Sequence, residues 1–224
     1  MNQRISRRDL LRFTMAAGAG LALPTVALAR QCEKSPAQAE GPFYMNSWDR
    51  TKPVPHHNDL TWVKDPSQRA EGEVIHLTGQ VTDPECRPLK GAVVEIWQAC
   101  RTGRYAHIAD PNPAWLDPNF RYFGEFVTDA NGMYSFKTIK PGPYPVGPSW
   151  IRPAHVHFKI SAGLAGMLTT QMYFAGDLHL GSDRLLNTIS KAEQKRLIIE
   201  PTRREGASTA DLYTFDIHLV PIRV

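Results

Sequence analysis

Two histidines separated by one residue are the sharpest chemical feature of the chain. They stand in the segment His155-Val156-His157. Residues two apart on a β-strand project to the same side, so both imidazoles can reach one metal ion. A pair of partly exposed strand histidines without a metal fits the same spacing. The remaining ligands must therefore decide between the two interpretations.

Different metals need different partners for such a pair. Zinc takes a third His, Cys or carboxylate, and iron(II) oxygenases take two His and a carboxylate. A carboxylate does not follow within a few residues, because Ile160 and Ser161 stand there. Asp177 is the carboxylate that a zinc or iron(II) site would use, and such a protein would be colourless.

Two tyrosines on turn-forming segments offer another kind of ligand. Tyr105 follows Gly103-Arg104, and Tyr144 lies within Pro141-Gly142-Pro143-Tyr144-Pro145. Tyrosine is normally neutral, with a pKa near 10, but a bound high-valent cation can hold it as phenolate. A hard anionic oxygen favours iron(III). A packed tyrosine with a hydrogen-bonded hydroxyl is the ordinary alternative.

Short alternating strands are the elements that must position these residues. Ile75, Leu77, Gly79 and Val81 share one face of the first strand. Strands are expected over 75–81, 92–96, 122–128, 133–138, 155–160, 168–174 and 213–220. The first two are expected to pair antiparallel, and Asn131-Gly132 indicates a hairpin between the third and fourth. About seven short strands favour an all-β fold, an antiparallel β-sandwich.

An extended arm and one short helix accompany the strands. Residues 30–73 are rich in Pro, Asn, Asp and Trp with little periodicity, which indicates an N-terminal arm wrapping the core. The β-sandwich domain, with long loops, is expected over 74–224. Ser190-Lys191-Ala192-Glu193 is a capping-box pattern and predicts a helix that ends near Pro201.

Residues 1–29 have the features of a signal peptide. Ser6-Arg7-Arg8-Asp9-Leu10-Leu11 resembles the twin-arginine signal, and Ala27-Leu28-Ala29 matches a signal-peptidase site. We expect export by the twin-arginine route to the periplasm or the extracellular space. The apolar run 13–28 is short and contains Gly and Pro, so no stable membrane insertion is expected after cleavage. Retention of this run as an anchor is the alternative.

Charge and cysteine content exclude other classes of function. The net charge is +4, and the signal peptide contributes a surplus of three, so the mature chain carries +1. This removes the electrostatic support for nucleic-acid binding. Cys32, Cys86 and Cys100 form no C-x-x-C pair, which argues against a zinc knuckle or a thioredoxin-like motif. Export permits one disulfide, and the sequence is compatible with any of the three pairings.

Several segments together resemble the intradiol ring-cleavage dioxygenases, specifically the protocatechuate 3,4-dioxygenase branch and its iron-bearing subunit. The matching segments are 40–44, 79–107, 126–145, 150–160 and 169–174. The resemblance implies a prealbumin-like sandwich with one non-haem Fe(3+) per chain. It implies that the metal ligands are Tyr105, Tyr144, His155 and His157.

The resemblance also implies a reaction. A catechol-type ring would be cleaved between its two hydroxylated carbons with O2 to a muconate-type diacid. Tyr144 would be the ligand that leaves and accepts a substrate proton. Arg152 would stabilise negative charge on the ring, and Gln171 would lie beside the substrate. Cys100 departs from the pattern, because this branch more commonly has Asn or Asp there.

The implied partners are a catechol-type substrate and O2, and homo- or hetero-oligomers are both compatible with the fold. Protocatechuate, unsubstituted catechol, hydroxyquinol and bulkier diols would need different rim residues, and a carboxylate-bearing substrate should meet an arginine or lysine. The alternative from another class is an exported prealbumin-like binding module without catalytic iron. Metal content separates the two interpretations.

Overall fold

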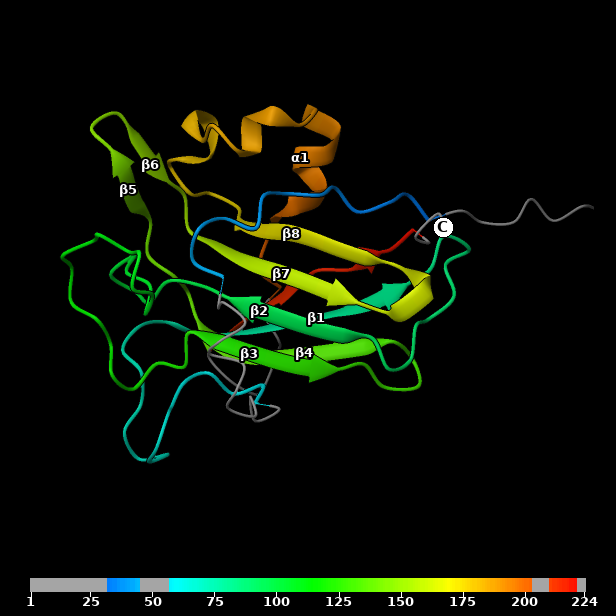
Figure 1. Ribbon diagram of the computed structural model, residues 1–224, viewed down its shortest axis with the longest axis horizontal. Helices are drawn as coiled ribbons and strands as arrows, with labels where there is room; N and C mark the ends of the chain where they lie inside the picture. Colours follow the sequence, from blue (N-terminus) through cyan, green and yellow to red (C-terminus); the bar gives the residue numbers. More distant parts are fainter. Residues whose placement is uncertain (1–31, 45–56, 203–209, 221–224) are drawn as a thin grey trace, which may run out of the picture.

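Two β-sheets pack face to face and enclose one apolar core (Figure 1). The computed structural model describes residues 32–44, 57–202 and 210–220. The first sheet contains β10 (Asp211–Thr214), β1 (Val74–Thr82), β4 (Met133–Ile139) and β11 (Ile217–His218). The second contains, in spatial order, β3 (Phe123–Val127), β2 (Val93–Trp97), β7 (His155–Ser161), β8 (Met167–Phe174) and β9 (Ile198–Ile199). β5 (Tyr144–Gly147) and β6 (Trp150–Arg152) pair with each other.

The alternating apolar pattern identified the core face correctly. Ile75, Leu77 and Val81 of β1 are fully buried or nearly so, and Phe158 of β7 faces them from the other sheet. The ring of Phe158 lies 6.0 Å from that of Tyr134 on β4, so aromatic side chains connect the sheets. The all-β sandwich predicted from the sequence is confirmed.

The predicted strand pairing was wrong in two places. β1 and β2 lie in different sheets, because β1 pairs with β4 and β2 pairs with β3 and β7. The Asn131-Gly132 turn forms, with Gly132 at φ 69°, but it leads from β3 in one sheet to β4 in the other. The connection is therefore a crossover between sheets and not a hairpin.

The sheets are also mixed rather than wholly antiparallel. β10 and β11 run parallel to β1, and β9 runs parallel to β8, while the central pairs are antiparallel. The strand expected over 213–220 is two short strands, β10 and β11, separated by Phe215 and Asp216. Parallel partners far away in the chain have no local turn signal, so periodicity could not indicate them.

One α-helix, α1 (Lys191–Leu197), lies beside β8 in the described part of the chain (Figure 1). Its capping box is formed as predicted, with the Ser190 side chain accepting from the Glu193 backbone and the Glu193 side chain accepting from the Ser190 backbone. Three short 3-10 helices occupy Gly163–Ala165, Leu180–Ser182 and Leu186–Thr188. Among the described residues, no helix has the length and apolar character needed to span a bilayer.

The described part of the arm, residues 32–44, is extended and lies against the second sheet (blue in Figure 1). The backbone N–H of Gln38 donates to the Thr169 carbonyl at 2.9 Å, and the Thr170 hydroxyl donates to the Pro36 carbonyl at 2.7 Å. Cys32 is disulfide-bonded to Cys86, and Cys100 is a buried free thiol. The predicted signal peptide lies outside the described residues, and the boundaries 1–29, 30–73 and 74–224 remain predictions.

Candidate metal centre

The two faces of β7 have different surroundings. Val156, Phe158 and Ile160 point into the core between the sheets. His155 and His157 point to the opposite face, where strand residues normally meet solvent, yet each is only 2% exposed. Loops and the arm cover this end of the sheet, so the two histidines are buried in a partly polar region on the side of β7 away from the main core.

Three lone-pair atoms converge there. The Nε2 atoms of His155 and His157 are 3.2 Å apart, and the hydroxyl oxygen of Tyr105 is 3.4 Å from His155 Nε2. The Tyr105 and Tyr144 rings lie 5.6 Å apart, edge to face. All four predicted metal ligands are thus brought together from three separate parts of the chain.

These separations fit a shared metal ion. Two donors that each bind one ion at about 2.1 Å, at angles near those of tetrahedral or octahedral sites, lie about 3.0–3.4 Å apart. His155 Nδ1 lies 2.6 Å from the Pro153 carbonyl, which assigns the proton to Nδ1 and leaves the lone pair on Nε2 directed at His157. Nitrogen and oxygen donors at these separations are spaced as ligands of one ion are, so the donor set fits a metal ion.

Burial sets the protonation states of these ligands. It lowers the pKa of His155 and of His157 well below 6.5, and the charge of Arg152 lowers both further. Both imidazoles are therefore neutral at pH 7, which is the metal-binding form. Burial raises the pKa of Tyr105 and of Tyr144, so only a compensating cation would turn these side chains into phenolates.

Glycines allow the two tyrosine-bearing turns to approach each other. Gly103 has φ +79°, and a Cβ there would overlap the Pro143 carbonyl and lie 2.9 Å from Tyr144 Cβ. A Cβ at Gly142 would overlap the Arg101 carbonyl. The Asp110 carboxylate accepts the backbone N–H of Tyr105 at 2.6 Å and so fixes the start of that loop.

The imidazole of His157 is held between an indole and the arm. The ring of Trp97 on β2 stacks on it at 4.7 Å and 11°, since Trp97 and His157 are register partners. On the arm, Gly41 has φ +74°, and a Cβ there would contact His157 Cε1 at 3.4 Å. The ring of Phe43 lies 4.6 Å from that of Tyr105. The arm therefore forms one wall of the centre.

Arg152 is buried beside the ligands and donates hydrogen bonds through Nε and Nη2. Its Nε donates to Asp183 at 2.8 Å, and its Nη2 donates to Gln171 at 2.7 Å and to the Tyr173 hydroxyl at 3.2 Å. Gln171 in turn donates to the Ala39 carbonyl of the arm at 2.7 Å. The predicted residues Arg152 and Gln171 are thus direct partners.

Sequence reasoning missed Asp183. Its side chain has no solvent exposure, and it both pairs with Arg152 and accepts the backbone N–H of Leu186 at 2.6 Å. It lies 31 residues after Arg152, in a segment with no strand or helix pattern, so spacing held no signal for it. Gly41 and Phe43 were in a segment noted only for its resemblance.

Asp177, the carboxylate of the zinc or iron(II) alternative, is occupied elsewhere. Its two carboxylate oxygens accept the backbone N–H groups of Ala154 at 2.9 Å and His179 at 2.8 Å. Within the part of the chain that the structure describes, no three His, Cys, Asp or Glu side chains form a metal-binding group. A metal ion held by His155 and His157 would therefore need ligands of another type, and Tyr105 and Tyr144 are the neighbouring candidates.

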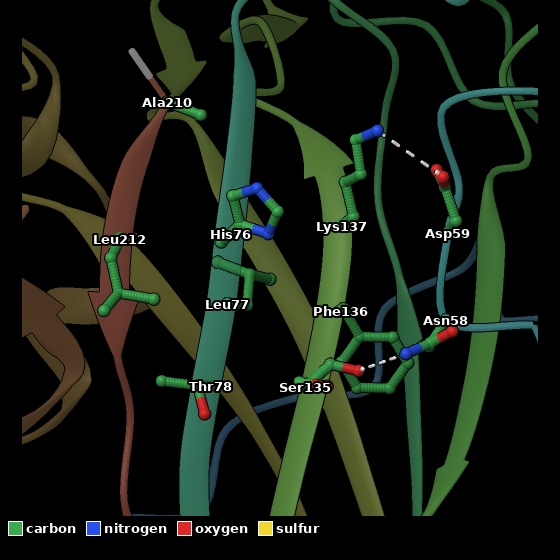
Figure 2. Close-up of a pocket in the computed structure, with 10 residues that line it drawn as sticks. All are labelled: Asn58, Asp59, His76, Leu77, Thr78, Ser135, Phe136, Lys137, Ala210 and Leu212. Carbon is green, nitrogen blue, oxygen red and sulfur yellow. Dashed lines mark hydrogen bonds and ion pairs between the residues drawn. The ribbon is translucent and has the colours of Figure 1, made fainter. Parts of the chain in front are cut away.

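A cavity of about 360 Å³ opens onto the centre. Tyr144, Arg152 and His157 line its inner end. A larger cavity of about 430 Å³ lies on the first sheet, over β1, β4 and β10 (Figure 2). Its charged lining includes the ion pair of Lys137 with Asp59 at 3.6 Å, and it contains none of the predicted site residues. Volume alone would therefore select the wrong cavity, and the converging donors identify the site.

An all-β sandwich with a buried cluster of two tyrosines and two histidines beside a cavity is an arrangement typical of non-haem metalloenzymes. The profile of a family described as "Dioxygenase" matches residues 39–221. The chain is 42% identical over 171 residues to the protocatechuate 3,4-dioxygenase beta chain of Burkholderia cepacia, covering 74% of this chain and 72% of the relative.

Two further similarities agree with this match. Catechol 1,2-dioxygenase 1 of Acinetobacter lwoffii is 33% identical over 192 residues, which cover 80% of this chain and 57% of that relative. The structure of a dioxygenase domain from Streptomyces sp. SirexAA-E superposes with a TM-score of 0.60 at 27% identity, covering 85% of this chain and all of that one. The chain belongs to the intradiol dioxygenase family and is a ring-cleavage dioxygenase.

Proposed function

We propose that the chain uses one non-haem Fe(3+), held by Tyr105, Tyr144, His155 and His157, to cleave a catechol-type ring with O2 to a muconate-type diacid. The observation that carries the proposal is the convergence on His155 Nε2 of His157 Nε2 at 3.2 Å and the Tyr105 hydroxyl at 3.4 Å. Two hard phenolate oxygens with two imidazoles suit iron(III) better than softer ions. When bound, the iron would supply a Lewis acid that withdraws electron density from the catechol.

The protein side chains would handle the substrate's protons and charge. Tyr144 borders the cavity, so once ionised its hydroxyl oxygen is placed to accept a proton from a catechol hydroxyl. Arg152 also lines the cavity and would stabilise negative charge that develops on the bound ring. Gln171 holds the Arg152 guanidinium in place and closes the site toward the arm.

A visible spectrum of the purified aerobic protein, with iron quantified in the same sample, tests the ligand set. We expect a broad tyrosinate-to-iron band that makes the protein red-brown and shifts when catechol is added. Tyr105→Phe and Tyr144→Phe should each weaken or abolish the band, because each removes one phenolate. Tyr213→Phe is the matched control, since Tyr213 is buried in the core away from the centre.

A protein that stays colourless after reconstitution with iron would overturn this assignment. The exported binding module without catalytic iron would then be the better account. Full colour in Tyr105→Phe and Tyr144→Phe would likewise refute the two tyrosines as ligands.

We also propose that the enzyme acts outside the cytoplasm, after export by the twin-arginine route. The twin-arginine pattern at Arg7-Arg8 supports this, and a Cys32–Cys86 disulfide is typical of an oxidising compartment. Cell fractionation with an antibody against the mature chain tests it. Recovery of the mature protein only from the spheroplast cytoplasm, or an unchanged distribution in Arg7→Lys with Arg8→Lys, would refute export by this route.

A further inference from the structure

The outer part of the cavity beside the metal centre is apolar. Beyond the inner residues Tyr144, Arg152 and His157, the walls carry mainly hydrocarbon surface, contributed by Pro42, Pro111, Pro145, Val146, Trp150 and Leu185. The volume of about 360 Å³ lies within the range of about 300–1,000 Å³ that holds drug-sized ligands. The cavity therefore has space for a ring substituent, and the walls that this substituent would contact are apolar.

The charges around the cavity disfavour an anionic substituent. Arg152 is the one lysine or arginine among the described lining residues, and its guanidinium is already paired with Asp183, Gln171 and Tyr173. The other charged side chain in the described lining is Asp110, a carboxylate. A carboxylate on the outer part of the substrate would meet no lysine or arginine besides Arg152, whose charge Asp183 already balances, so its lost hydration would be poorly compensated in an apolar site.

Arg184 packs on the lining residue Trp150 without lining the cavity itself. Its guanidinium carbon lies 5.4 Å from the centre of the Trp150 ring, and its Nη2 lies 3.3 Å from the Ser149 hydroxyl. It packs on Trp150 and is absent from the described lining. Its effect on substrate choice can be tested directly by mutation.

We infer that the enzyme prefers catechols with an uncharged, apolar substituent over catechols that carry a carboxylate. This inference rests on the proposed function, because it concerns the same site. The substrate preference would then differ from that of the 42% identical relative named for protocatechuate, a substrate that carries a carboxylate. Val146 and Asp110 on the outer walls are the residues to which we assign this preference.

The test compares 4-methylcatechol and 4-tert-butylcatechol with protocatechuate on the iron-loaded, full-length enzyme. We expect kcat/KM to be higher for the alkyl catechols by about tenfold or more. Anaerobic titration followed by the shift of the visible band should give lower dissociation constants for the same compounds. This second measurement separates binding from turnover.

Val146→Arg should reverse the preference, because it places a cation at an apolar wall. The ratio of kcat/KM for protocatechuate to that for 4-methylcatechol should rise about tenfold or more. Val127→Arg is the matched control, since Val127 is 45% exposed, similar to Val146 at 51%, and does not line this cavity. It should leave the ratio unchanged, as should Arg184→Ala.

Each contrary result has a distinct meaning. Protocatechuate cleaved as efficiently as the alkyl catechols would overturn the inference while leaving the proposed function in place. A selective loss of protocatechuate cleavage in Arg184→Ala would also overturn it, because Arg184 would then be binding the carboxylate. An iron-loaded enzyme that cleaves none of the three compounds would refute the proposed function, and the inference with it.

Discussion

The Arg152–Asp183 pair is a fully enclosed pair of opposite charges, with side chains only 4% and 0% exposed. Removing one partner from such a pair leaves the other charge buried without compensation, which typically costs about 3–5 kcal/mol. We expect Asp183→Ala to lower the free energy of unfolding by about that amount. Asp183→Asn should cost less, because its carbonyl oxygen can still accept a hydrogen bond.

Urea denaturation of the metal-free protein measures both variants. Glu71→Ala is the control, because Glu71 pairs with Arg101 at the surface, where both side chains are about half exposed. Exposed pairs contribute about 0–1 kcal/mol, so this variant should be close to wild type. Equal losses in Asp183→Ala and Glu71→Ala would contradict the role assigned to the buried pair.

The Asp83 carboxylate makes a contribution to the free energy of unfolding that depends on pH. Burial raises the pKa of its carboxyl, but hydrogen bonds from the Arg87 backbone N–H and guanidinium outweigh this, so the pKa lies below 3.8. A depressed folded-state pKa stabilises the protein above 3.8, and this contribution is lost as the pH falls through the folded-state value. Asp83→Asn should therefore destabilise the protein at pH 6 more than at pH 3, as measured by urea midpoints. An equal loss at both pH values would contradict this.

A site residue could be predicted from the sequence where its type and its position in a strand indicated the same role. His155 and His157 were visible because alternate strand positions share a face, and the structure places both imidazoles together. Tyr105 and Tyr144 could be noted as possible ligands from the sequence, but only the resemblance implied them, since a tyrosine on a turn has no distinctive spacing. Asp183 could not be found, because its partner Arg152 lies on a distant element and a buried ion pair has no sequence period.

At the level of elements, the two tyrosine-bearing turns depend on close backbone packing. Gly103→Ala would add a Cβ that overlaps the Pro143 carbonyl, at a residue with φ +79°. A left-handed conformation costs a non-glycine residue about 1–2 kcal/mol, and the overlap must also push the Tyr144 turn away. We expect less iron per chain and a weaker visible band, with the β-sheet circular dichroism retained.

Gly181→Ala is the control for that variant. A Cβ at Gly181 meets no atom within 4 Å, so iron content and colour should match wild type. A Gly103→Ala protein with full iron and an unchanged spectrum would show that the two turns do not need this close approach.

The strands show why the buried face of a strand was easier to predict than the strand with which it pairs. Burial alternates along β1 as the sequence indicates, because each side chain's direction follows from its own position. Pairing depends instead on the path of the chain between strands. The segment around Asn131-Gly132 has the chemistry of a hairpin turn, yet β3 and β4 pair with different neighbours. The start of the helix was predicted correctly because its capping box is wholly local, but its end was not, since α1 ends at Leu197 and β9 follows where the helix was expected to continue toward Pro201.

At the scale of the whole molecule, the Cys32–Cys86 disulfide ties the start of the arm to the loop after β1. The bond spans 54 residues, and loss of such a bond typically costs about 2–5 kcal/mol. We expect Cys32→Ser with Cys86→Ser to lower the thermal midpoint. Dithiothreitol should lower the wild-type midpoint to the same value and leave the double variant unchanged. A wild-type protein insensitive to reductant would contradict the disulfide's contribution to stability.

The same arm closes the metal centre, with Gly41 against His157 and Phe43 against Tyr105. Its contacts with Thr169 and Gln171 do not involve the disulfide. The double variant should therefore retain colour when folded, although it is less stable. Loss of colour at a temperature where the variant remains folded would show that the covalent tie also holds the centre closed.

The stacking of Trp97 on His157 also gives the protein a built-in optical probe. An excited indole in van der Waals contact with an imidazole is readily quenched by an open-shell ion bound to that imidazole. Trp97 is well placed for such quenching, because its ring lies 4.7 Å from that of His157. If His157 binds the proposed iron, emission from unlabelled protein would report iron binding in real time, and Trp97→Phe would keep an aromatic ring there while silencing the signal.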